Sequence, residues 1–560
     1  MRRPRAEVKA DSQSGCNNYS GPSWKNVAGR IARCYSAALK AIQMATLKLI
    51  LCWLRTQRSS TRVGFGLQMV FRVLTSVFSL VWTPLLLGSM GRALNGAFLS
   101  FQSLASLGGL GDLGMGGMVS IQTSRLLGQG NESELRLFLA RVRALFLLLA
   151  LVAPLIFLAV SPHLFETLKF ENVSGVGSLP LLAAVGAAAV GLIILNSYIT
   201  NLNYGCSNIT WPIVPGFVAL QLGFLGHWVL ARQHCALWAQ YAPYVLSGLL
   251  AQWTGWWFIR SSHPALATVR PLAFEGKQFL SLAGKSFWVY LYCVAAGLNM
   301  TVDRLLINLG FGPAMVPPYQ YNYRLCELAM FVVVSASLAS MPKITQWLAS
   351  PDAGLRERAR HESERLNKFQ TLLGCAAVLV YLAVNDWFIG FWLGKDLQVP
   401  LVWQAAFAAI LAVSAAGYAG VDLAARCCDQ GLRVGGITML LAALLNLGLS
   451  WVAMRRGSVF GIAVATVVAQ SATVLFLGWF ACRKIKMSWW RLSLRNWLLG
   501  LAMVGAGWGM RQLLPMDDVW AISMQVVADL ALLWVAARIV GIGREDLRQE
   551  IAICRAMLRG

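Results

Sequence analysis

The sequence has few charged residues for its length. Only 13% of its 560 residues are Asp, Glu, Lys or Arg, whereas 57% are hydrophobic. A soluble domain carries roughly 25% charged residues, because these residues form the hydrated shell around its core. A large soluble fold is therefore excluded for most of this chain.

The sequence also lacks the motifs that hold metals, nucleotides or disulfide frameworks. Its twelve cysteines are scattered, without the spacing of a zinc site or a set of disulfides, so we interpret them as small packing residues. No P-loop is present. We therefore expect no cofactor and no metal, and we expect energy to come from an ion gradient or the membrane potential.

What the sequence does have is a long series of apolar stretches. About fourteen of them are each about long enough to cross a bilayer, and little separates one from the next. The predicted spans lie near 64–88, 94–123, 138–160, 178–199, 212–231, 241–259, 284–309, 319–346, 370–393, 399–425, 433–453, 459–481, 496–511 and 519–540. The predicted fold class is thus an all-α integral membrane protein.

The net charge of +24 is distributed unevenly along the chain. If the N-terminus is cytoplasmic, 38 of the 48 Lys and Arg residues lie on the cytoplasmic side, seven lie outside and three lie within spans. This bias follows the positive-inside rule and does not suggest nucleic-acid binding. It predicts cytoplasmic termini and an even number of spans, although Arg455 and Arg456 fall outside as a local exception.

The first sixty residues are basic and show no apolar core with a cleavage site, so no cleavable signal peptide is expected. Residues 24–54 are predicted to form an amphipathic helix in the membrane interface, drawn to anionic lipid. A partly disordered extension and a start codon assigned too early are the alternatives.

The spans are grouped in a way that suggests a duplicated unit. We predict a basic extension at 1–62, an N-terminal lobe of six spans at 63–260 and a cytoplasmic linker at 261–283. A C-terminal lobe of six spans follows at 284–482, and a basic loop, two further spans and a tail occupy 483–560. A weak self-match at an offset of 221 residues aligns Gly91 with Gly312 in the first outer hairpin of each lobe. Six spans return the chain to its starting side, so the repeats are parallel.

Several motifs in this order resemble one family of transporters. They are Thr83-Pro-Leu-Leu-Leu87, Leu110-Gly-Asp-Leu-Gly-Met-Gly116, Arg125-Leu-Leu-Gly-Gln-Gly130, Asp303-Arg-Leu-Leu-Ile307, Gly310-Phe-Gly312, Tyr319-Gln-Tyr-Asn-Tyr-Arg-Leu325, Asn446 and Gly461-Ile-Ala-Val-Ala-Thr-Val-Val-Ala469. Together they resemble the polysaccharide flippases of the multidrug/oligosaccharidyl-lipid/polysaccharide (MOP) superfamily over roughly residues 64–480. The long N-terminal extension and the last two spans depart from the simplest family pattern.

The resemblance implies two lobes around a central, often cationic cavity that opens alternately to each side. It implies a polyprenyl-diphosphate-linked oligosaccharide as the cargo, for export of a surface polysaccharide. A polysaccharide polymerase and glycosyltransferases are then candidate protein partners. The exact sugar and lipid carrier stay open.

Three arginines within spans are the candidate substrate-binding residues: Arg72, Arg304 and Arg324. A charge at the bilayer centre costs about 2.5–3.5 kcal/mol on insertion scales, so it is either paired or faces water. Guanidinium groups suit a diphosphate because their planar fork makes paired, charge-assisted hydrogen bonds. The alternative is that these arginines form salt bridges that fix the packing of the helices.

Three acids within spans are the candidate ion-coupling or gating residues: Asp112, Asp303 and Glu327. Their depth suggests that Asp112 pairs with Arg72 and that Asp303 pairs with Arg324, whereas Arg304 has no obvious partner. Glu327 follows Arg324 by three residues, which favours an ion pair on one helix. Asp112 is either a titrating, ion-coupling carboxylate or a packing residue held by Arg72.

Further features leave other interpretations open. Tyr319, Tyr321 and Tyr323 are either sugar-stacking residues or part of an aromatic belt at the outer interface. A MATE-type ion-coupled exporter of small molecules is the nearest functional alternative, although that class favours acidic cavity residues. A membrane-embedded glycosyltransferase or polymerase is less favoured, because the longest outer loop, 161–177, offers little for catalysis. We therefore predict a transporter and not an enzyme.

Overall fold

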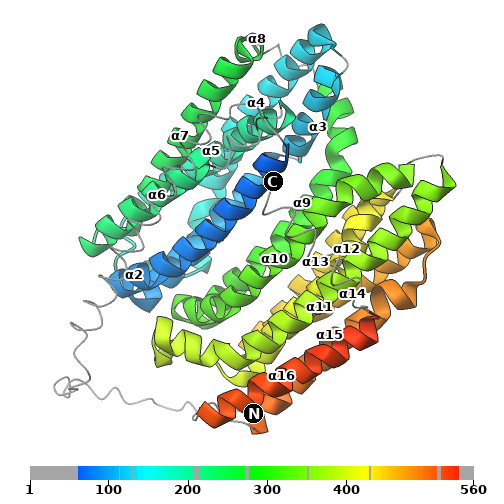
Figure 1. Cartoon of the computed structure of the whole chain (residues 1–560). Helices are drawn as coiled ribbons and strands as arrows, with labels where there is room; N and C mark the ends of the chain where they lie inside the picture. The colour runs from blue at the N-terminus through cyan, green and yellow to red at the C-terminus, as the bar shows by residue number, and fades with distance from the viewer. Residues whose placement is uncertain are drawn as a thin grey trace, which may run out of the picture. The chain divides into compact units, whose positions relative to one another are not determined.

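The computed structural model describes residues 61–112, 114–128, 130–206, 208, 214–271, 276–349, 352–427, 430–513 and 519–541. Within these ranges every element is a helix (Figure 1). The predicted all-α fold is confirmed. The predicted interfacial helix at 24–54 lies outside the described residues.

The first group of helices, which we call the N-lobe, packs around one buried core. Its members are α2 (Thr61–Gly109), η1 (Leu110–Asp112), α3 (Met115–Gly128), α4 (Glu132–Thr167), η2 (Phe170–Asn172), α5 (Leu179–Gly205), α6 (Val214–Arg232) and α7 (Leu237–Ser262). The short α8 (Pro264–Ala267) packs against α7.

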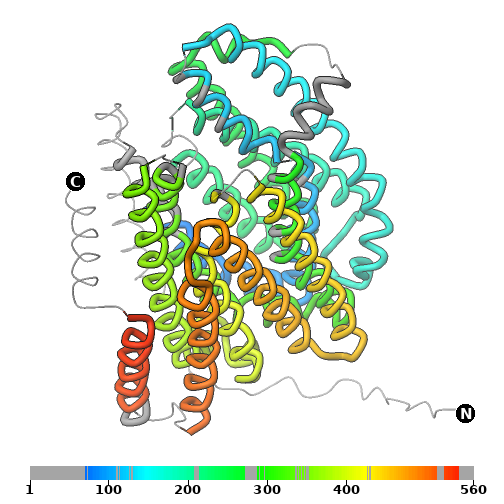
Figure 2. Tube along the Cα trace, turned by 90° about the vertical axis from the view of Figure 1, so that its right-hand side faces the viewer, coloured from blue at the N-terminus to red at the C-terminus, as the bar shows by residue number. Residues whose placement is uncertain are grey.

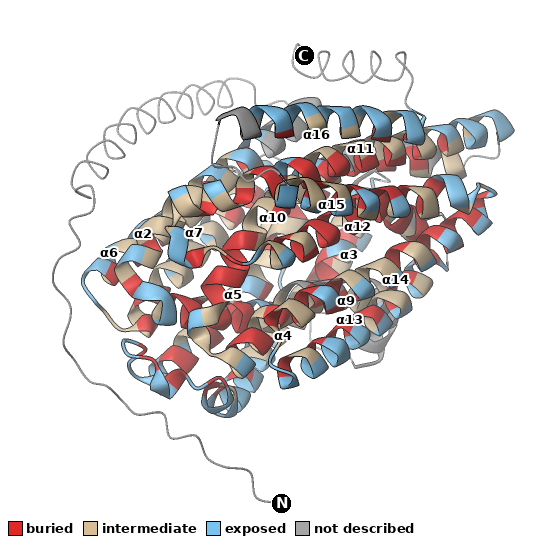
Figure 3. Cartoon of the chain, turned by 90° about the horizontal axis from the view of Figure 1, so that it is seen from below, coloured by how far each residue is buried: buried red, intermediate tan, exposed pale blue. Residues whose placement is uncertain are grey.

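The second group, the C-lobe, surrounds two further clusters of buried apolar side chains. It contains α9 (Gly276–Phe311), η3 (Pro313–Met315), α10 (Val316–Ala349), α11 (Ala353–Trp392), η4 (Lys395–Leu397), α12 (Leu401–Arg426), α13 (Gly431–Arg455) and α14 (Val459–Ile485). Helix α12 lies centrally, since it contacts α10, α11, α13 and α14 (Figure 3). The lobes belong to one compact unit, Thr61–Gly560.

Two last helices stand beside the C-lobe. A π-helical turn, η5 (Trp490–Leu494), leads into α15 (Arg495–Leu513), and α16 (Val519–Val540) follows; both α15 and α16 pack against α11 (Figure 2). Asp386 of α11 pairs with Arg511 of α15 at 3.5 Å and accepts a hydrogen bond from Gln404 at 2.5 Å. A partly buried ion pair thus attaches α15 to α11 of the C-lobe.

Each of the fourteen predicted apolar segments coincides with one or two helices over most of its described residues. Among the residues that the structure describes, nine helices are long and apolar enough to cross a membrane, judged by length and composition. The exact number of fourteen spans therefore stays a prediction. The side chains that point away from the two lobe cores are largely apolar and exposed, such as Leu151, Trp253 and Phe391, as expected of helices that face lipid.

The predicted first hairpin is present although α2 runs on through it. Gly91 has φ 73° and ψ 171°, a non-helical conformation that divides α2 into two arms. Trp82 on the first arm contacts Trp228, and Phe98 on the second contacts His227, so the chain folds back on the same stretch of α6. Gly312, its predicted counterpart, has φ 85° and ψ 165°. The shared backbone conformation supports the proposed repeat.

The second predicted span, 94–123, is not one continuous helix. It ends at Gly109, passes through η1 and restarts as α3 at Met115. The Asp112 carboxylate accepts a hydrogen bond from the Gly114 N–H at 2.9 Å, and Gly114 has φ 67°. A side chain at Gly114 would meet the backbone of Tyr290 at 2.7 Å. Gly114 therefore permits both the break and close packing of α9 at this point.

The turn at Gly91 leads to a stability prediction. Its φ and ψ lie in a region that is essentially restricted to glycine, so Gly91→Ala is expected to cost about 1–3 kcal/mol and to lower the melting temperature of the purified protein. Gly88→Ala is the matched control, because Gly88 lies in the helical part of α2 with open space around it. Thermal unfolding in detergent is the measurement, and an equal effect of both substitutions would contradict this account of the turn.

Candidate functional site

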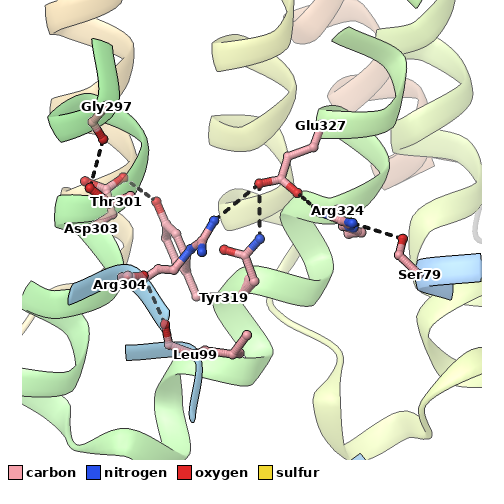
Figure 4. Close-up of polar contacts among 11 residues, drawn as sticks. Ser79, Leu99, Gly297, Thr301, Asp303, Arg304, Tyr319, Arg324 and Glu327 are labelled. Carbon is pink, nitrogen blue, oxygen red and sulfur yellow. Dashed lines mark hydrogen bonds and ion pairs between the residues drawn. The ribbon is translucent and has the colours of Figure 1, made fainter. Parts of the chain in front are cut away.

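Glu327 of α10 binds two arginines that the sequence suggested as substrate ligands. Its Oε1 lies 3.6 Å from Nη2 of Arg304 on α9, and its Oε2 lies 2.6 Å from Nη1 of Arg324 on α10 (Figure 4). Gln320 donates to the same Oε1 at 3.1 Å. Residues 320, 324 and 327 share one face of α10 because they are four and three residues apart. The predicted pair of Arg324 with Glu327 is confirmed.

The two arginines carry more positive charge than their acid neutralises. One carboxylate faces two guanidinium groups, and the side chains of Arg304, Arg324 and Glu327 are only 18%, 29% and 21% exposed. Among the described residues, Nε of Arg304 has no hydrogen-bond partner, nor does the side-chain amide of Asn308 one turn further along α9. Taken by themselves, the two arginines and Glu327 carry one excess positive charge and unused donors in a largely buried position, and Asp303 precedes Arg304 on α9.

Arg324 also reaches the other lobe. Its Nη2 donates to Oγ of Ser79 on α2 at 2.9 Å (Figure 4). The guanidinium thus connects Glu327 in the C-lobe with the first arm of α2 in the N-lobe. A guanidinium group can do this because its five N–H donors point in fixed, separate directions.

Asp303, the residue before Arg304, does not pair with Arg324 as its depth suggested. That prediction is wrong, as is the expectation that Arg304 has no partner. Asp303 is 7% exposed, and its Oδ2 accepts hydrogen bonds from Tyr319 and Thr466, each at 2.9 Å. Its Oδ1 has no partner among the described residues. Successive residues on a helix point about 100° apart, so Arg304 and Asp303 face different neighbours.

Further oxygen atoms surround the Asp303 carboxylate. Oγ1 of Thr466 also lies 3.2 Å from Oδ1 of Asn446, and Ser450 donates to that same oxygen at 3.2 Å. Helices α9, α10, α13 and α14 each contribute to this group. The arrangement places a carboxylate with a free oxygen beside hydroxyl and amide oxygens inside the C-lobe.

Tyr319 and Tyr321 of α10 have neither of the predicted roles. Tyr319 and Tyr321 are 4% and 6% exposed, so they do not form an interfacial belt or an open stacking surface. Tyr319 donates to Asp303, and Tyr321 donates to Oδ1 of Asn95 across the lobes at 2.6 Å. Tyr323 packs its ring against Phe407. Their hydroxyls and rings hold α10 against α9, α2 and α12.

Asp112 lies at the break in the second span. Its Oδ2 accepts a hydrogen bond from Ser197 of α5 at 2.7 Å, in addition to the Gly114 N–H on Oδ1. The side chain of its predicted partner, Arg72, lies outside the described part of the structure, so that pair stays a prediction. The contacts of Asp112 are those of a residue that holds a helix break and joins η1 to α5.

Sequence reasoning missed the N-lobe contribution to this region. Ser79 and Asn95 are small polar residues in apolar stretches, 9% and 1% exposed, and both bind side chains of α10. A polar residue inside a predicted span was the available signal, since such a group needs a hydrogen-bond partner in the membrane. The sequence does not show which lobe supplies that partner.

Comparison with solved structures identifies the architecture. A structure described as the inward-facing conformation of a multidrug resistance MATE family transporter of the MOP superfamily matches with a TM-score of 0.52 at 14% identity, over 77% of this chain and 97% of that one. A MATE protein in complex with MaL6 matches with a TM-score of 0.53 at 13% identity, over the same shares. The chain has the fold of a MATE transporter. No protein-family model and no curated protein sequence matches it.

The MATE fold agrees with the resemblance to the MOP superfamily at the level of architecture. At 13–14% identity the likeness concerns the fold, and the choice between a polysaccharide flippase and a small-molecule exporter depends on the side chains. The described residues include no cluster of three or more His, Cys, Asp or Glu that could hold a metal ion.

Proposed function

We propose that the chain is a membrane transporter that moves a polyprenyl-diphosphate-linked oligosaccharide across the bacterial cytoplasmic membrane by alternating access. The observation that carries the proposal is the excess guanidinium charge around Glu327, at a point where the C-lobe contacts the N-lobe. A buried excess charge is costly unless an anion shares the site for part of the cycle. The MATE fold and the sequence motifs support a transporter.

In this proposal Arg304 and Arg324 bind the diphosphate, and Arg72 is a third ligand. Glu327 is the gating residue, because its carboxylate pairs with both guanidinium groups and so competes with an anion for them. An incoming phosphate displaces the carboxylate from one arginine or both. Charge-assisted bonds from two guanidinium forks to phosphate are stronger than the 3.6 Å contact that Arg304 now makes.

Asp303 is the proposed ion-coupling residue. Its free carboxylate oxygen and the oxygens of Thr466 and Asn446 form a small, buried group that suits a proton or a monovalent cation. Because Asp303 precedes Arg304, a change in its charge acts directly on the cargo-binding helix. Asp112 is a second, weaker candidate, since its carboxylate is engaged by Ser197 and Gly114. A polymerase and glycosyltransferases are proposed partners that use or supply the cargo.

A MATE-type exporter of small molecules is the second candidate function, because the matching structures are themselves MATE transporters. The two candidates differ in the charge of the cargo. An excess of arginine favours an anion, whereas a cationic drug would need an acidic site.

Reconstitution of the full chain in liposomes tests the proposal. A fluorescent, short-chain polyprenyl diphosphate disaccharide on the inner leaflet is expected to move outward at least about tenfold faster than in protein-free liposomes, judged by quenching from outside. The matched control is the same lipid carrying the disaccharide without phosphate, which should not be accelerated. Transport of a cationic dye in place of the diphosphate lipid would favour the exporter and refute the flippase.

A further inference from the structure

A proline in the first arm of α2 leaves one backbone carbonyl without its usual partner. Pro84 lies inside the helix and has no N–H to donate to the carbonyl of Leu80, four residues earlier. In a membrane such a carbonyl needs another donor. The indole Nε1 of Trp392 donates to it at 2.5 Å, and Trp392 is the last residue of α11 in the C-lobe.

Two more hydrogen bonds join the same regions of the two lobes. Tyr321 donates to Asn95, and Arg324 donates to Ser79. We call these three contacts the inter-lobe clasp: Leu80 with Trp392, Asn95 with Tyr321 and Ser79 with Arg324. Its N-lobe members all belong to α2, on either side of the turn at Gly91.

The clasp is a tightly packed unit. Asn95 and Tyr321 are buried, and the ring of Tyr321 lies edge-on to Trp392 with 6.1 Å between centroids. A Cβ atom on Gly96 would collide with the carbonyl oxygen of Pro313, so only glycine permits this approach of the two hairpins. The bond between Asn95 and Tyr321 is therefore shielded from water, which raises the cost of leaving either residue unpaired.

We propose that the inter-lobe clasp closes the pathway at the end of the molecule that carries the Gly91 and Gly312 turns, and that Pro84 sets its strength by keeping the Leu80 carbonyl free for Trp392. Separation of the lobes at that end must break all three bonds. The inference rests on the alternating access proposed above but not on the identity of the cargo.

The clasp is also connected to the cargo site. Arg324 divides its donors between Glu327 and Ser79. An anion that binds this guanidinium competes with both acceptors and loosens one clasp bond. Cargo binding at the arginines therefore favours opening of the clasp, which supplies the differential interaction that a change of state requires.

A double-mutant cycle on the full-length chain in nanodiscs tests the clasp. A short-range fluorophore pair at Arg92 and Asp396, introduced through noncanonical amino acids, reports the separation of the lobes; these side chains lie 3.4 Å apart and are 44% and 89% exposed. Trp392→Phe removes the indole donor and is expected to raise the ratio of open to closed molecules about tenfold. Trp387→Phe, an exposed tryptophan on the same helix, should leave the ratio unchanged.

Pro84→Ala tests whether the effect of Trp392→Phe depends on the free carbonyl of Leu80. Alanine restores an N–H to the Leu80 carbonyl, so Trp392→Phe should raise the ratio less than about threefold in this background. Tyr321→Phe removes a bond that does not depend on Pro84, and it should raise the ratio in both backgrounds. The inference would be overturned if Trp392→Phe changed the ratio of open to closed molecules equally in the presence of Pro84 and in the Pro84→Ala background. It would also be overturned if neither Trp392→Phe nor Tyr321→Phe changed that ratio. Because the readout uses no cargo, it fails or succeeds independently of the transport assay.

Discussion

Replacing Arg304 by alanine is expected to abolish transport of the diphosphate-linked lipid and to leave the folded protein intact. Glu327 then neutralises Arg324 alone, so the site loses its excess positive charge. Each charge-assisted hydrogen bond contributes about 1.5–3 kcal/mol, so the loss of a bidentate guanidinium should weaken cargo binding at least about 100-fold. The rate of lipid translocation in liposomes is the measurement.

Two further variants make the Arg304 prediction specific. Arg304→Lys keeps the charge but loses the planar fork, and it should retain an intermediate rate. Arg136→Ala is the matched control, since Arg136 forms only an exposed ion pair with Glu132 and such pairs contribute little. Full transport by Arg304→Ala, or an equal loss in Arg136→Ala, would contradict the role of the arginine pair.

Asp303→Asn is expected to uncouple transport from its ion gradient. The asparagine oxygen still accepts the hydrogen bonds of Tyr319 and Thr466, so the C-lobe should fold, but the group no longer carries a negative charge. Gradient-driven accumulation should fall at least about tenfold, whereas exchange of labelled for unlabelled cargo at equilibrium should persist. A comparison of the two assays under imposed sodium and proton gradients identifies the coupling ion.

A pair of threonines supplies the control for the coupling site. Thr466→Val removes a hydroxyl that bonds Asp303, and it should reproduce part of the uncoupling. Thr473 lies two turns further along the same helix and donates only to the carbonyl of Ala469, so Thr473→Val should transport normally. If Asp303→Asn accumulates cargo as well as the unchanged protein does, Asp303 is a packing residue and another group couples transport to the ion.

The positions of the helices followed from the sequence, because the length and apolar character of a span depend on local composition alone. The Gly91 turn was predicted for the same reason, since a short polar gap separates two apolar stretches. The cluster of glycines around Asp112 suggested close packing or a bend, but the contacts at the break depend on tertiary structure: Gly114 packs against Tyr290, and Ser197 holds the carboxylate.

The partners of the buried charges were predicted only where they lie on one helix. Arg324 and Glu327 are three residues apart, so helical geometry brings them together. Whether Asp303 or Arg304 approaches the Arg324–Glu327 pair depends on the rotation of α9, which depth along the span does not determine. The structure turns Arg304 towards Glu327 and Asp303 towards Thr466.

The central claim is that the two guanidinium groups of Arg304 and Arg324, which share the single carboxylate of Glu327, bind a phosphate anion. Equilibrium binding of a short polyprenyl diphosphate to the purified chain, followed across a range of salt concentrations, tests it most directly. The account predicts that Glu327→Gln binds more tightly than the unchanged protein, and that Arg304→Ala with Arg324→Ala binds undetectably. Equal affinity in all three proteins would show that these guanidinium groups serve only to hold the helices together.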